Sequence, residues 1–120
     1  MSNGLDYVAT NLVTRTLMEP GATISLFGSP APIDGFYVGG AVESLVFPDL
    51  HAVRFGPVRE LLEGATSDYV GFWTDDDTGQ VYFDLVDWYQ DEEEALKVAR
   101  DRNELAIWSV AGDLEIRLSE

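Results

Sequence analysis

The sequence predicts an α+β fold, a single domain of 120 residues in which a mostly antiparallel sheet is flanked by two to three helices. Short apolar runs bounded by Gly, Pro and Asp recur along the chain, as they do in antiparallel sheets. Longer stretches repeat apolar residues at helical spacing. No repeat or linker divides residues 1–120, and their number suits one domain.

The first half is predicted to supply one helix and three strands. Apolar residues recur at helical spacing over residues 5–18. Residues 23–27, 36–38 and 42–47 are short apolar runs typical of strands. The last two lie close together in the sequence, which makes them candidates for a hairpin.

A second helix is expected in the middle of the chain. Residues 50–55 fit either a strand or a helix. Pro57 suits the first position of the helix that follows, because the missing N–H costs no hydrogen bond there. This helix is expected to end near Gly64.

The second half begins with a predicted hairpin. Residues 69–73 and 80–86 are strand-like, and an Asp-rich turn joins them. Gly79 precedes the return strand, where a positive φ is needed.

A third helix and a second hairpin are expected to complete the chain. Asp91 is placed to cap the helix, with Glu94 as its reciprocal partner. Residues 105–110 and 114–118 are predicted strands, and a Gly-containing turn joins them.

Composition excludes several classes of function. The chain has no cysteine, which excludes disulfides, thiolate metal sites and cysteine nucleophiles. The net charge is −15 with only seven Lys and Arg, which disfavours direct binding of nucleic acid or anionic membranes. No run approaches the roughly 18 apolar residues of a membrane span, and the N-terminus does not resemble a signal peptide. We therefore expect a protein of the cytoplasm.

No catalytic motif is apparent. The single histidine, His51, has Asp49 nearby but no Gly-x-Ser-x-Gly nucleophile, so we interpret it as an ordinary loop or strand residue. If Gly79 took the sixth place of an EF-hand loop, Thr74 would fall at the first ligand position and Leu85 at the twelfth. Neither residue suits its position, so the run does not fit a calcium loop. A hairpin turn explains the Asp-rich run, and no phosphate-binding glycine loop is present. We therefore predict a non-enzymatic protein with no metal and no cofactor.

The aromatic residues are interpreted as packing residues. Trp73, Trp88 and Trp108 lie at or near strand positions, where core or sheet-face packing is commoner than a ligand platform. The alternative is an enzyme or small-ligand-binding domain with a pocket lined by Trp88 or Tyr82.

Negative charge is concentrated in the second half of the chain. From Asp68 to Glu94 there are ten acidic residues and no Lys or Arg, an arrangement that stability alone does not favour. Asp84 is expected on the opposite face of its strand from Phe83 and Leu85, so the acids are predicted to form one face for a partner. The residues assigned to this acidic face are Asp75, Asp76, Asp77, Asp84, Asp87, Asp91, Glu92, Glu93 and Glu94.

Several segments resemble small uncharacterised proteins encoded by actinobacterial phages. These segments are residues 69–82, 91–96 and 105–108, and residues 35–40 are similar too. The resemblance covers about residues 35–118, and its motifs are structural, so no functional residue is carried over. It implies a phage or prophage accessory protein in a bacterial cytoplasm. Small acidic phage proteins often inhibit host or defence enzymes.

These observations lead to one hypothesis and its alternatives. The hypothesis is an accessory protein that binds a basic host or defence protein through the acidic face and so imitates the phosphate array of DNA. A solvated surface that only increases solubility explains the same charge. A structural or assembly role in the virion, with homo-oligomerisation, is the alternative of another class.

Overall fold

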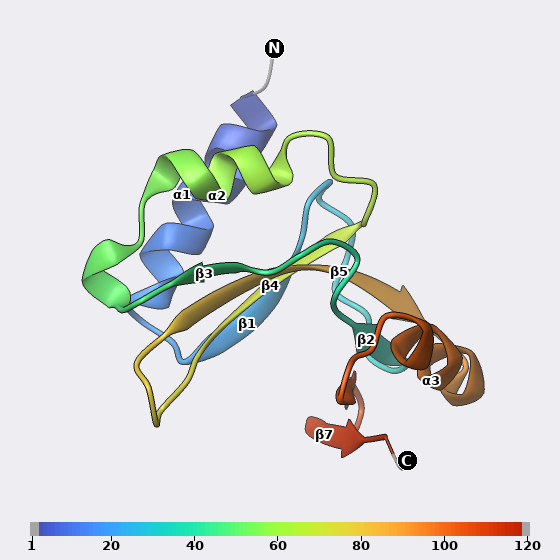
Figure 1. Ribbon diagram of the computed structural model, residues 1–120. Helices are drawn as coiled ribbons and strands as arrows, with labels where there is room; N and C mark the ends of the chain where they lie inside the picture. Colours follow the sequence, from blue (N-terminus) through green and yellow to red (C-terminus); the bar gives the residue numbers. More distant parts are fainter. Residues whose placement is uncertain (1–2, 119–120) are drawn as a thin grey trace.

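The computed structural model describes residues 3–118, which form three α-helices, one 3₁₀ turn and seven strands (Figure 1). The helical elements are α1 (Asn3–Thr16), η1 (Leu50–Ala52), α2 (Phe55–Leu62) and α3 (Glu92–Asp101). The strands are β1 (Gly21–Ser25), β2 (Phe36–Val38), β3 (Leu45–Phe47), β4 (Tyr69–Thr74), β5 (Val81–Tyr89), β6 (Ala106–Ser109) and β7 (Leu114–Arg117). The predicted α+β class is confirmed.

The strands form one antiparallel sheet in the order β1-β4-β5-β2-β6-β7, and β3 also pairs with β5. Along one edge of β5, β3 pairs with Val81–Phe83 and β2 with Asp87–Tyr89. The predicted hairpin between residues 36–38 and 42–47 is therefore wrong. The edges of β2 are taken by β5 and β6, which leaves none for β3.

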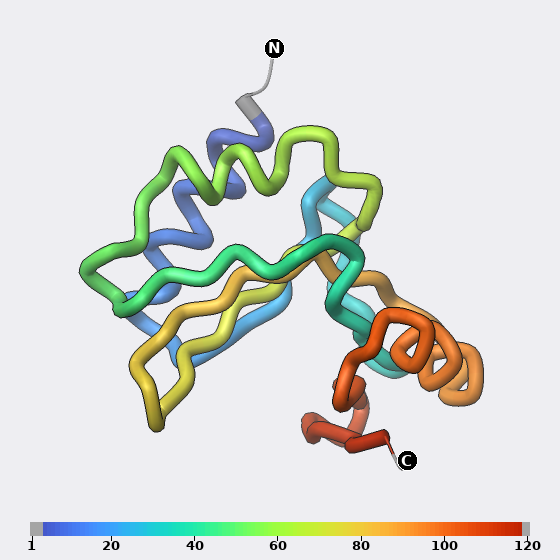
Figure 2. Tube along the Cα trace, viewed as in Figure 1, coloured from blue at the N-terminus to red at the C-terminus, as the bar shows by residue number. Residues whose placement is uncertain are grey.

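Helices cover one face of the sheet in two separate places (Figures 1 and 2). α1 and α2 pack over β1, β3, β4 and the first part of β5, and this core contains Leu12, Leu62 and Phe83. α3 packs over β2, β6 and the end of β5, where Val38 and Ile107 are buried. Burial of their apolar faces stabilises all three helices.

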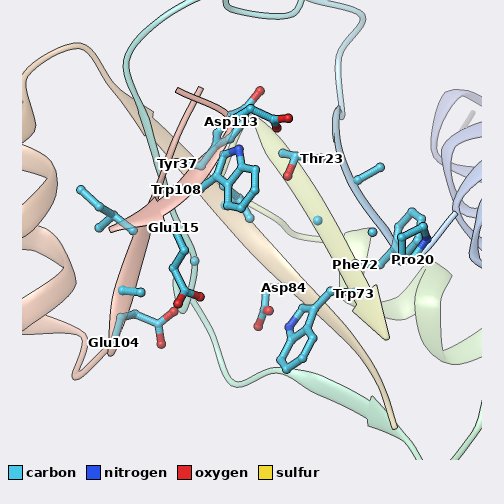
Figure 3. Close-up of a pocket in the computed structure, with 17 residues that line it drawn as sticks. Pro20, Thr23, Tyr37, Phe72, Trp73, Asp84, Glu104, Trp108, Asp113 and Glu115 are labelled. Carbon is cyan, nitrogen blue, oxygen red and sulfur yellow. The ribbon is translucent and has the colours of Figure 1, made fainter. Parts of the chain in front are cut away.

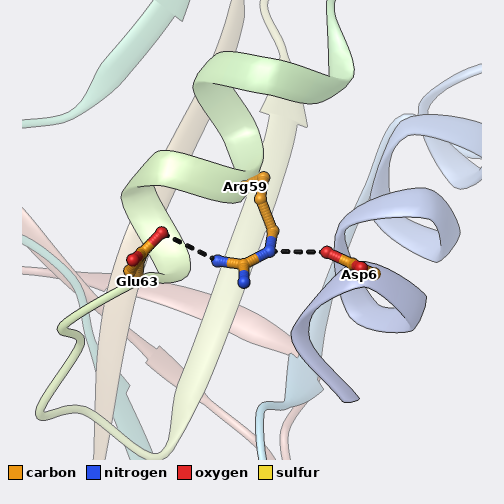
Figure 4. Close-up of polar contacts among 3 residues, drawn as sticks. All are labelled: Asp6, Arg59 and Glu63. Carbon is orange, nitrogen blue, oxygen red and sulfur yellow. Dashed lines mark hydrogen bonds and ion pairs between the residues drawn. The ribbon is translucent and has the colours of Figure 1, made fainter. Parts of the chain in front are cut away.

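An arginine joins the two helices of the first group (Figure 4). Nε of Arg59 in α2 lies 2.7 Å from Oδ1 of Asp6 in α1, and its Nη1 lies 3.2 Å from Oε2 of Glu63. Because both carboxylates are exposed, these ion pairs contribute little to the free energy of folding. We expect them mainly to fix the orientation of α1 against α2.

Local predictions in the second half are confirmed. Gly79 has a φ of 80°, as the hairpin turn requires. Asp91 caps α3, because its Oδ2 accepts a hydrogen bond of 3.2 Å from the N–H of Glu94. β5 runs three residues further than predicted, because β2 supplies a partner for its last residues.

Boundaries in the first half differ from expectation. Residues 50–55 contain the 3₁₀ turn η1, and Oδ1 of Asp49 accepts a hydrogen bond from the N–H of Ala52. Pro57 is the third residue of α2 rather than the first. The first turn of a helix has several N–H groups without helical partners, so proline is tolerated at this position too.

Candidate functional site

An open cavity of about 730 Å³ lies on the sheet, and its lining residues come from six of the strands (Figure 3). β1 and β7 are the two ends of the sheet path, yet Thr23 of β1 and Glu115 of β7 both line the cavity. The sheet therefore curls around it. A concave site of this size is typical of ligand-binding pockets.

Strand alternation decides which side chains face the cavity. Phe83 and Leu85 are buried in the core under α1 and α2, so Asp84 and Val86 lie on the opposite face. In β6, Ile107 is buried against α3, and the next residue, Trp108, lines the cavity. The cavity is thus on the face of the sheet away from the helices.

Two glycines keep the cavity open. Gly71 is the register partner of both Thr23 and Asp84. A Cβ at Gly71 would lie 3.2 Å from Oγ1 of Thr23, so a side chain there would fill the space between these residues. Gly21 is the register partner of Trp73 and adds no side chain beside the indole.

Two tryptophans line the cavity and are partly exposed. Trp73 is 46% exposed and Trp108 is 41% exposed, so neither belongs to a buried core. Trp73 does pack on the sheet face, because it stacks on Tyr82 with ring centroids 4.5 Å apart and an angle of 8°. Trp88 and Tyr82, the predicted pocket residues, do not line this cavity. Nε1 of Trp88 instead donates a 2.7 Å hydrogen bond to the carbonyl oxygen of Asp34.

Among the residues that the structure describes, four carboxylates line the cavity, and none of its lining residues is Lys or Arg. They belong to Asp84, Glu104, Asp113 and Glu115. In Figure 3 the side chains of Glu104 and Glu115 point toward one another, on the side of the cavity next to Asp84. Arg117 lies outside the lining, with its Nε 3.2 Å from Oε1 of Glu115, and both side chains are largely exposed.

Burial makes two of these carboxylates more difficult to ionise. It raises the pKa of Asp84, and a hydrogen bond donated by Oγ of Ser44 to Oδ1 partly opposes this. Burial also raises the pKa of Glu104, and the negative charge of Asp84 raises it further, while Arg102 acts in the opposite direction. The two groups therefore repel each other in a partly desolvated place.

Glu104 reaches the cavity because of how α3 ends. Asn103 adopts a φ of 60°, its N–H donates to the carbonyl of Arg100, and the N–H of Glu104 donates to that of Ala99. This is the hydrogen-bond pattern of a Schellman motif, which turns the chain back. A Cβ at Gly39 would lie 3.2 Å from Oε1 of Glu104 and 3.8 Å from Cβ of Asp84, so both acids lie beside this glycine.

The residues of the predicted acidic face lie in separate parts of the structure. Asp75–Asp77 form the hairpin turn before β5, and Asp91–Glu94 lie at the start of α3 after it (Figure 1). The nine residues of β5, roughly 26 Å of strand, separate the two groups. Asp84 lines the cavity, whereas Asp87 lies on the other face and forms an ion pair of 2.6 Å with Arg102.

Other candidate chemistry is accounted for by local structure. His51 is exposed in η1, and the Asp49 carboxylate that could have oriented it caps that turn instead. Within residues 3–118, no three His, Asp or Glu side chains gather in a way that could hold a metal ion. No helix of this part of the chain has the length and apolar character needed to cross a membrane.

Sequence reasoning found part of this site. The alternation of β5 predicted the orientation of Asp84. Glu104, Asp113 and Glu115 were not identified, and Trp73 and Trp108 were interpreted as packing residues rather than as residues of a site. The clearest sequence signal for the position of Glu104 is the preceding Asn103. Asn favours the left-handed conformation that ends a helix and turns the chain back. Comparison with known proteins finds no matching family model, curated protein or solved structure.

Proposed function

We propose that this chain is a non-enzymatic interaction protein that binds a basic protein and holds that protein's cationic groups in the cavity. One observation carries the proposal. The described lining combines four carboxylates with two partly exposed tryptophans and contains no Lys or Arg. Both kinds of side chain attract cations, the carboxylates by charge and the indoles by their negative faces.

The electrostatics of the cavity favour such an occupant. Asp84 and Glu104 repel each other and are partly desolvated, as the direction of both pKa shifts indicates. A bound cation would relieve that repulsion and replace lost hydration. The free protein is therefore under electrostatic strain that the partner removes.

The acids of the hairpin turn and of the start of α3, outside the cavity, have a supporting role in this proposal. Asp75–Asp77 and Asp91–Glu94 add negative charge at the two ends of β5. Such charge accelerates association with a basic protein and makes the association sensitive to salt. The resemblance to actinobacterial phage proteins supports a host or defence protein as the partner.

The test is affinity capture from an actinobacterial lysate with three baits, washed at low and then at high salt. The baits are the wild type, a cavity variant carrying Asp84→Asn and Glu104→Gln, and a turn variant carrying Asp75→Asn, Asp76→Asn and Asp77→Asn. We expect a basic protein that the wild type and the turn variant retain, that the cavity variant loses, and that elutes as salt rises.

Three outcomes would overturn the proposal. Equal capture by the wild type and the cavity variant would remove the cavity from the interaction, and loss with the turn variant alone would move the site to the hairpin. Self-association without a partner would instead support a structural role in the virion.

A further inference from the structure

We infer that the cation held in the cavity is an arginine side chain of the partner, with its N–H groups directed at Asp84 and Glu104 and its flat guanidinium against the exposed part of Trp73. The inference rests on the proposed function, because the arginine belongs to the basic protein proposed there. It adds the chemical identity of the group that is recognised.

Trp73 lines the cavity and is 46% exposed. Tyr82 covers one face of its indole, with ring planes 8° apart. On the far side of Trp73 the register partner is Gly21, which has no side chain to cover the indole. A guanidinium is flat and stacks on an indole, which a lysine ammonium cannot do.

Trp73 lies two residues along β4 from Gly71, the register partner of Asp84. The carboxylates of Asp84 and Glu104 suit several donors at once. Oδ1 of Asp84 already accepts a hydrogen bond from Ser44, which leaves Oδ2 and the carboxylate of Glu104 for a ligand. Gly39 and Gly71 lie next to these acids and add no side chain to the space. Guanidinium has five donors in a fixed fork and is more weakly hydrated than ammonium, so it loses less on entering an aromatic cavity.

The arginines next to the cavity are held elsewhere. Nη2 of Arg102 lies 2.6 Å from Asp87, and its Nη1 donates to the carbonyl oxygens of Val38 and Gly39. Arg102 therefore lowers the pKa of Glu104 only from a distance, without reversing the rise. Arg117 pairs with Glu115 at the exposed rim. The positions beside Asp84 and Glu104 are left for an arginine from outside.

The ionisation of these acids makes the binding sensitive to pH. Asp84 and Glu104 face each other, with Arg102 nearby and Asp113 and Glu115 in the same lining. The cation binds the ionised carboxylates, and burial raises the pKa of both Asp84 and Glu104. Affinity should therefore begin to fall, as pH is lowered, before ordinary exposed carboxylates are protonated.

The experiment uses the three indole N–H signals of the ¹⁵N-labelled protein, assigned with single Trp→Phe variants. The probes are N-acetyl-arginine amide, N-acetyl-lysine amide and N-acetyl-citrulline amide, and the last replaces the guanidinium with a neutral urea of similar shape. Trp88 is the internal reference, because its N–H is bonded to Asp34 and it does not line the cavity. We expect the arginine probe to shift the Trp73 and Trp108 signals saturably, while Trp88 changes little.

Variants connect these shifts with the proposed contacts. Asp84→Asn with Glu104→Gln should weaken the arginine probe by at least about tenfold, as expected when two charged acceptors become neutral. Glu60→Gln with Asp101→Asn removes the same charge from exposed positions outside the cavity and should leave the affinity unchanged. Trp73→Phe, which leaves both acids in place, tests the stacking separately and should also weaken binding.

Several outcomes would overturn the inference. Equal shifts with the citrulline probe would show that charge is not recognised, and equal affinity for the lysine probe would remove the preference for guanidinium. An absence of any shift in a wild type that still captures its basic partner would refute this inference and leave the proposed function standing. A saturable arginine shift without any captured basic protein would refute the proposed function alone.

Discussion

The two helix-covered regions of the sheet differ in how they are held together. Under α1 and α2 lies a broad core in which large side chains such as Phe83 and Leu12 are fully buried. Under α3 the buried cluster of the described chain consists of Val38, Ala95, Ala99 and Ile107. The second region buries less apolar surface, so polar contacts must hold a larger share of its structure.

The cavity lies where these regions meet. Trp73 and Asp84 come from strands of the first region, whereas Glu104 and Trp108 come from segments of the second. The distance between the two sides of the cavity depends on how firmly the smaller region is attached to the rest of the sheet. The site can therefore be disturbed without damage to the main core.

The largest expected effect is in the broad core. Phe83→Ala should lower the free energy of unfolding by about 4 kcal/mol, because it removes a fully buried ring that contacts Phe47 and Phe72. Urea denaturation followed by tryptophan fluorescence measures this. Phe83→Leu, which keeps most of the apolar volume, should lose much less, and equal losses would contradict the role assigned to the ring.

The second largest effect is expected from a substitution that removes the contacts attaching the smaller region to the sheet. The side chains of Arg102 and Asp87 are 22% and 26% exposed, and Arg102 also bonds to the carbonyl oxygens of Val38 and Gly39. Arg102→Met should cost about 2 kcal/mol, because it leaves Asp87 half-buried without its partner.

Hydrogen exchange would locate this loss. We expect the amides of β6 and β7 to lose protection in Arg102→Met while those of β4 keep theirs. Arg100→Met, at an exposed position of the same helix, is the matched control. Uniform loss across the sheet would show that the regions do not open separately.

A smaller effect concerns the start of α3. Asp91→Ala should reduce the free energy of unfolding by about 1 kcal/mol, since the N–H of Glu94 loses its capping acceptor. Thermal unfolding measures the change. Glu92→Ala removes a neighbouring charge without removing the cap, and if it cost as much, the helix dipole rather than the cap would explain the loss.

The smallest effect is a gain in stability in the cavity. Burial raises the pKa of Asp84 in the folded protein, so the folded state binds this proton more tightly than the unfolded state does. Wild-type stability therefore falls as pH rises above the ordinary range of an aspartate. Asp84→Asn avoids this and should be more stable at pH 7 by on the order of 0.5 kcal/mol.

The pH dependence checks that explanation. The advantage of Asp84→Asn should disappear at acidic pH, where the carboxyl is protonated in both states. Asp76→Asn in the exposed turn is the control and should change stability little. An asparagine variant that is less stable at pH 7 would show that Asp84 supports the fold rather than being held for a ligand.

Local features were predictable because neighbouring residues determine them. The turn at Gly79, the cap at Asp91 and the orientation of Asp84 away from Phe83 and Leu85 were all expected. Each depends on backbone conformation or alternation within one segment. The hairpin of residues 36–38 with 42–47 was mispredicted, because its outcome depended on β5 and β6, which lie far along the chain.

By itself, the sequence determined the α+β class, the helices and most strands, and the excess of negative charge in the second half. These follow from apolar periodicity and composition, which are properties of the chain before it folds. Folding places the acids in separate parts of the molecule and brings Asp84, Glu104, Trp73 and Trp108 into one cavity. Strand register and the curl of the sheet set those positions, because contacts between distant segments select them.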